Sequence, residues 1–90
     1  MCTYLTEHVA IDGSGKGATG WFPTSRATVY VDHPVDAPYG HTVNIDVVNP
    51  QLGSSARVAL ELTEESALPL AASITRAIAH APAGLAAKDQ

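Results

Sequence analysis

The chain has 90 residues, of which 46% are apolar and only 16% are charged. This length predicts a single domain, and a charged fraction well below the about 25% of ordinary soluble domains favours a homo-oligomer, most simply a dimer, that covers part of the surface. The net charge of −4 and the five scattered basic residues argue against nucleic acid or a membrane surface as the main partner.

The amino-terminal residues carry no targeting pattern. They show neither the basic segment nor the apolar segment of a signal peptide, and no apolar run in the chain reaches the about 18 residues of a membrane span. We therefore expect a cytoplasmic protein. The single cysteine, Cys2, excludes an internal disulfide and a CxxC motif.

The first third of the chain predicts one strand and one loop. Apolar and polar residues alternate from residue 2 to residue 11, which is typical of a half-buried strand. Residues 12–20 contain four glycines, and this composition predicts a loop. Trp21 and Phe22 follow, and we expect these two aromatic residues to anchor the loop to the body of the domain.

Three further strands and one helix follow. Alternation predicts strands at residues 26–33, 41–49 and 56–62, separated by segments rich in proline and glycine. The helix begins with either Thr63 or Ser66 as its N-cap, because Pro69 falls within the first turn only in the second case. It ends near His80, ahead of Pro82.

This order predicts a two-layer α+β domain: a four-stranded antiparallel sheet (β-β-β-β-α) with one C-terminal helix packed on one face. Residues 1–82 form the expected domain, and residues 83–90 form an expected flexible tail. Apolar residues at helical spacing are expected in the core, namely Leu70, Ile74, Ala77, Ile78 and Ala81. The outer face of the sheet, with Tyr4, Tyr30 and Val48, is where a dimer contact is expected.

Two histidines lie at the two feet of the hairpin predicted for residues 26–49. Pairing these strands about Ala37 aligns their apolar faces, which fixes the register. The opposed pairs are then Val29 with Ile45, Val31 with Val43, and His33 with His41. Opposed β-carbons lie about 4.5–5.5 Å apart, so two imidazoles there can share one metal ion through bonds of about 2.0–2.1 Å. We expect one divalent transition metal ion, such as zinc, copper or iron.

A metal site at this hairpin needs at least one further ligand. The candidates are Cys2, His8, Asp32, Asp36 and His80. Of these, Cys2 and His8 complete the predicted metal set with His33 and His41. A free cysteine is more commonly a small buried apolar residue, so this alternative remains open for Cys2.

A second group of candidates surrounds the glycine-rich segment. Its glycine amides and Lys16 are similar to a phosphate cradle, but the GxxxxGK[ST] spacing is absent and a strand follows instead of a helix. A mobile loop or lid over a small organic ligand is therefore the favoured interpretation. The candidate ligand contacts are Gly15, Lys16, Trp21 and Tyr39.

Three interpretations of the histidine pair stay open. The pair can bind a metal, handle a proton or bind a ligand, or simply hold the hairpin through bonds to nearby carbonyls. The leading hypothesis is a small protein that binds a divalent transition metal, with or without enzymatic activity. The alternative is a non-catalytic dimeric module that binds a small organic ligand or a partner protein.

Several segments of the chain resemble one family. They are residues 1–6, Gly13-Ser14-Gly15-Lys16-Gly17, Asp32-His33-Pro34, and residues 41–50. Together they resemble an uncharacterised family of small bacterial proteins known only as a domain of unknown function. The resemblance covers nearly the whole chain and implies no activity.

Overall fold

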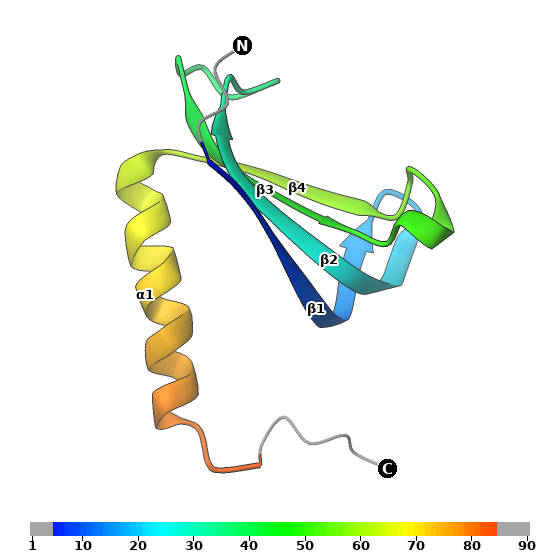
Figure 1. Cartoon of the computed structure of the whole chain (residues 1–90), viewed down its shortest axis with the longest axis vertical. Helices are drawn as coiled ribbons and strands as arrows, with labels where there is room; N and C mark the ends of the chain where they lie inside the picture. Colours follow the sequence, from blue (N-terminus) through cyan, green and yellow to red (C-terminus); the bar gives the residue numbers. More distant parts are fainter. Residues whose placement is uncertain (1–4, 85–90) are drawn as a thin grey trace.

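A computed structural model describes residues 5–84 of the chain. The elements follow in the order β1 (Thr6–Gly17), β2 (Gly20–Asp32), β3 (Thr42–Val48), the short 3-10 helix η1 (Pro50–Leu52), β4 (Arg57–Leu62) and α1 (Glu64–His80). The four strands form one antiparallel sheet in sequence order. The predicted α+β class is confirmed (Figure 1).

The register predicted for the second hairpin is also confirmed. Val29 pairs with Ile45 and Val31 pairs with Val43, and the ladder ends at Asp32 and Thr42. The paired strands share one apolar face because their hydrophobic residues fall at the same alternate positions. His33 and His41 lie one residue beyond the ladder, at the mouth of this hairpin.

The loop predicted for residues 12–20 is wrong. These residues continue β1 through Gly17, and β2 begins at Gly20, so that only Ala18 and Thr19 form the turn. The register shifts between Ala10 and Gly13, and the end of the first hairpin bends upward there (Figure 1). The bend brings the backbone of β1 close to β4, which needs glycine. A β-carbon on Gly17 would lie 3.0 Å from the Ser55 carbonyl oxygen.

The tightest packing lies where this bent hairpin meets the start of β4. Phe22 is 7% exposed and Ala56 is 6% exposed, and they are the buried apolar residues of the described chain. Phe22 therefore anchors the hairpin, as expected of the aromatic pair, whereas the neighbouring Trp21 is exposed. The buried core sits at the end of the sheet opposite the histidines.

Helix α1 begins with Thr63 as its N-cap, whose hydroxyl accepts a hydrogen bond from the Ser66 amide at 3.2 Å. Pro69 therefore lies inside the helix, beyond its first turn. The helix ends at His80, as predicted. None of the described helical residues is buried, so the prediction that the apolar stripe of α1 lies in the core is wrong for a single chain. Among residues 5–84, no helix is long and apolar enough to cross a membrane.

Candidate histidine site

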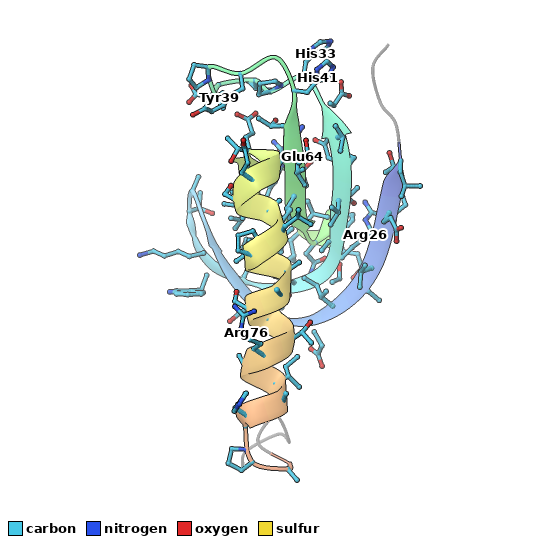
Figure 2. All side chains as sticks on the ribbon, turned by 90° about the vertical axis from the view of Figure 1, so that its left-hand side faces the viewer. Arg26, His33, Tyr39, His41, Glu64 and Arg76 are labelled. Carbon is cyan, nitrogen blue, oxygen red and sulfur yellow. The ribbon has the colours of Figure 1, made fainter. Side chains whose placement is uncertain are left out.

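The imidazole rings of His33 and His41 stack against each other at the mouth of the β2–β3 hairpin. Their centroids lie 4.4 Å apart and their planes are inclined by 30°. Figure 2 shows both rings together at the end of the molecule that lies farthest from Arg76. The strand register thus brings the two rings into contact, because residues 33 and 41 occupy opposed positions just past the ladder.

The tautomer of His33 follows from its hydrogen bond to the Gly40 carbonyl. The Nδ1 atom lies 2.9 Å from that oxygen, and a carbonyl can only accept, so Nδ1 carries the proton. In the neutral ring the lone pair is then on Nε2. Asp32 adds a second constraint, since its carboxylate accepts the backbone N–H of His33 at 2.7 Å. Both bonds limit how the His33 ring can be placed.

His8 and His80, two further candidate ligands, lie away from this pair. His8 lies in β1, where its Nδ1 is 3.1 Å from the Thr28 hydroxyl, and His80 lies at the far end of α1, where its Nδ1 donates to the Arg76 carbonyl. Cys2 lies outside the described residues. Within residues 5–84, no three His, Cys, Asp or Glu side chains gather as a metal site would require.

The connection between β2 and β3, residues 33–40, folds across the polar face of the sheet; we refer to it as the strap. Three successive amides of the strap, those of Val35, Asp36 and Ala37, donate to the Glu61 carboxylate of β4 at 2.6, 3.1 and 2.9 Å. These hydrogen bonds, led by that from Ala37, hold the pKa of Glu61 below its ordinary value. Glu61 therefore ties the histidine-bearing connection to the opposite edge of the sheet.

Beneath the strap, the polar face carries a connected network. The Asp46 carboxylate accepts from the Tyr30 hydroxyl at 3.0 Å and from the Arg57 guanidinium at 2.9 Å. Burial raises the pKa of Tyr30, and the hydrogen bond to Asp46 raises it further. Asn44 is buried next to Thr42, whose hydroxyl donates to the Asn44 side-chain oxygen at 2.5 Å. This face, where a dimer contact was expected, is thus partly covered by the chain itself.

The predicted ligand contacts do not form one cluster. Gly15 and Lys16 pair with Phe22 and Trp21 in the bent hairpin, and a β-carbon on Gly15 would meet the side chains of Thr24, Val58 and Phe22 at 3.3–3.5 Å. Gly15 is therefore a packing position. Trp21 and Lys16 are exposed at that end, whereas Tyr39 is exposed in the strap.

Sequence reasoning missed Glu61 as a structural link and the groove beside α1. The groove has a volume of about 440 Å³ and separates the helix from the apolar face of the sheet. Its described lining is apolar except for one residue and comprises Val29, Val43, Ile45, Leu62, Glu64, Ala67, Leu68, Leu70, Ala71 and Ile74. The apolar residues at helical spacing in α1 indicate this surface, but their spacing alone favours a closed core over an open groove.

The fold and the stacked pair define a class of small α+β protein. Its antiparallel sheet is bent and is crossed by the strap, and two histidines stack at the mouth of one hairpin. The chain belongs to a family of unknown function (DUF6295), whose model matches residues 1–87. The resemblance to an uncharacterised family is thereby confirmed. Comparison with curated proteins and with solved structures gives no match.

Proposed function

We propose that the protein binds a divalent transition metal ion through His33 and His41. The observation that carries the proposal is the contact between the two rings, whose centroids are 4.4 Å apart. Two nitrogens that share one ion through bonds of about 2.0–2.1 Å are at most about 4.2 Å apart. The 4.4 Å separation is between ring centres, so it places the rings close enough for one nitrogen of each to reach a common ion once the rings turn.

The protonation of His33 supports the same proposal. Metal-binding histidines commonly donate one ring N–H to a carbonyl or carboxylate, which fixes the tautomer and directs the other nitrogen to the metal. The Nδ1–H of His33 donates to the Gly40 carbonyl in this way, so Nε2 is the ligand atom of the proposal.

One rearrangement is part of this proposal. In a stacked pair the in-plane lone pairs run side by side, so the rings must splay for both to bind one ion. Both side chains are exposed and lie beyond the strand ladder, so a change of rotamer at His41 achieves this without disturbing the sheet, while His33 keeps its hydrogen bond to the Gly40 carbonyl. Water or the Cys2 thiolate would supply the remaining ligands of zinc, copper or iron.

The test is metal binding by chain purified without an affinity tag. We expect one ion per chain by elemental analysis or calorimetry with zinc, copper or iron(II). His33→Ala and His41→Ala should each weaken binding by more than about tenfold, because each removes a direct ligand. His80→Ala is the matched control, since His80 is also exposed and also donates Nδ1–H to a carbonyl, but at the end of α1.

Two results would sink the metal proposal. One is that no ion binds and that zinc, copper and iron leave the thermal stability unchanged. The other is that an ion binds equally well to His33→Ala, His41→Ala and the parent chain. His8→Ala tests whether His8 is a further ligand of the ion. Weaker binding by this variant would mean that His8 leaves the Thr28 hydroxyl to reach the ion.

The second candidate function is a non-catalytic dimeric binding module. The observation that favours it is the open groove beside α1, which lies on other residues than the histidine pair. For such a module, His33→Ala and His41→Ala leave the metal content at zero in both variant and parent.

A further inference from the structure

The apolar stripe of α1 faces the groove but remains accessible to solvent. Leu68, Ile74 and Ile78 are 70%, 56% and 71% exposed. From Ser66 to Thr75 the helix carries no charged residue, so this stretch lacks the charged side chains that a surface helix normally presents to water. The single chain therefore leaves a continuous apolar patch uncovered.

The dimensions of the chain point to the same missing contact. A folded monomer of 9.3 kDa has an accessible surface of roughly 5,000 Å², whereas this chain exposes 6827 Å². Its Cα radius of gyration is 14.7 Å, against about 12 Å for a compact domain of this length.

The excess surface has the size of a subunit interface. Counted over the whole chain it amounts to about 1,800 Å², which exceeds the roughly 1,000 Å² that each subunit of a small obligate dimer covers. A bound small molecule would cover much less.

We propose that a second copy of this chain covers the groove, with the two α1 helices packed antiparallel about a twofold axis. A twofold contact requires a self-complementary surface. With the axis between Leu70 and Ala71, Leu70 of one copy opposes Ala71 of the other, and Ala67 opposes Ile74. Large side chains then meet small ones on both sides of the axis, which is what close helix packing needs.

A small apolar molecule is the competing occupant of the groove. Ligand sites usually contain several polar groups that fix the orientation of the ligand, but Glu64 is the one polar residue of the described lining. A small molecule would also leave Ile78 exposed, since Ile78 does not line the groove. A second helix covers the groove, and in this register Ile78 meets the start of that helix at the partner's Thr63. The proposal rests on none of the residues of the metal proposal.

Sedimentation analysis and light scattering of the tag-free chain test the proposal. We expect twice the mass of 9.3 kDa, and a midpoint of thermal unfolding that rises with protein concentration, because association stabilises the folded state. A constant monomer mass up to the highest concentration reached would overturn the proposal. So would a monomer that carries a bound small molecule in native mass spectrometry.

Two variants locate the interface. Ile74→Glu and Ile78→Glu should each weaken self-association by at least about tenfold, because the dimer would bury an unpaired charge. Ile78 is the safer position, since its exposure in the single chain means that folding of one copy does not depend on it. Ala72→Glu is the matched control: it adds the same charge to α1 at a residue that does not line the groove and should remain dimeric. A dimer that survives Ile78→Glu and Ile74→Glu unchanged would refute this interface, even if the parent chain is a dimer.

Discussion

Single side chains join distant parts of this molecule. His33 closes the mouth of the β2–β3 hairpin through the Gly40 carbonyl and the His41 ring. Glu61 joins the strap to β4 across more than 20 positions of sequence. Glu61 alternates with the apolar residues of its strand, but this alternation carries no information on the hydrogen-bond partners of Glu61, because backbone amides have no residue type. The geometry of the histidine pair depends on this link, since the strap also carries His33 and Gly40.

Glu61→Gln should loosen the strap. The carboxylate accepts three N–H groups with two oxygens, whereas a glutamine offers one acceptor oxygen and presents its own N–H groups in place of the other. We expect faster hydrogen exchange at Val35 and Ala37, measured by NMR, and unchanged exchange in the core of β2. Glu65→Gln on α1 is the matched control. Unchanged protection of the strap amides in Glu61→Gln would contradict this role.

The pH dependence of the strap follows from the same carboxylate. The pKa of Glu61 is lowered from its ordinary value of 4.5 by the amide hydrogen bonds. A group whose pKa falls on folding contributes stability above the unfolded value and loses it as the pH falls through the folded value. The strap should therefore stay protected at neutral pH and open only below pH 4.5. A titration of the Glu61 side chain by NMR with a midpoint at or above that value would show the explanation to be incorrect.

At the scale of secondary structure, the bent hairpin is the element that the sequence concealed. Glycine has no side chain, so the alternation that marks a strand is invisible between Gly13 and Gly17. The composition predicted a loop for this reason, although the backbone pairs as a regular hairpin. The glycines are needed because β1 approaches β4 too closely for a β-carbon at one of them.

Gly17→Ala and Gly13→Ala should have opposite effects on stability. A β-carbon at Gly17 meets the carbonyl oxygens of Ser55 and Arg57 at 3.0 and 3.2 Å, so the strands must separate, at a cost of roughly 1–3 kcal/mol. A β-carbon at Gly13 meets the Thr24 hydroxyl at an ordinary contact distance of 3.8 Å. Alanine there should stabilise the folded protein by about 0.4–1 kcal/mol, because it lowers the conformational entropy of the unfolded chain. Denaturant unfolding measures both. Equal effects would indicate that the bend does not depend on the close contact at Gly17.

At the scale of the whole molecule, packing is uneven. The bent hairpin and β4 enclose the buried residues Phe22 and Ala56, while α1 stands beside the apolar face with a groove between them (Figure 1). Helix α1 therefore packs less tightly on the sheet than the bent hairpin packs on β4. Local stability should differ accordingly between the sheet and the helix.

Hydrogen exchange should reveal this difference in a variant that cannot form the proposed dimer. In the Ile78→Glu variant we expect the amides of α1 to lose most of their protection, because most helical stability in proteins comes from tertiary packing and Pro69 removes a hydrogen bond inside this helix. The amides of β2 and β3 should remain protected by the sheet. The Ala72→Glu variant serves as the control. Full protection of α1 in a proven monomer would show that its contacts within one chain are sufficient.

The sequence by itself determined the local structure and one register. Strand alternation predicted the second hairpin and its opposed histidines, and the end of α1 before Pro82 also followed from the sequence, because these features depend on residues close together in the chain. Tertiary structure alone decided the path of the glycine segment, the choice of Thr63 as N-cap, the capture of the strap by Glu61 and the exposure of α1. These depend on backbone contacts and on packing between distant segments, which leave no periodic pattern in the sequence.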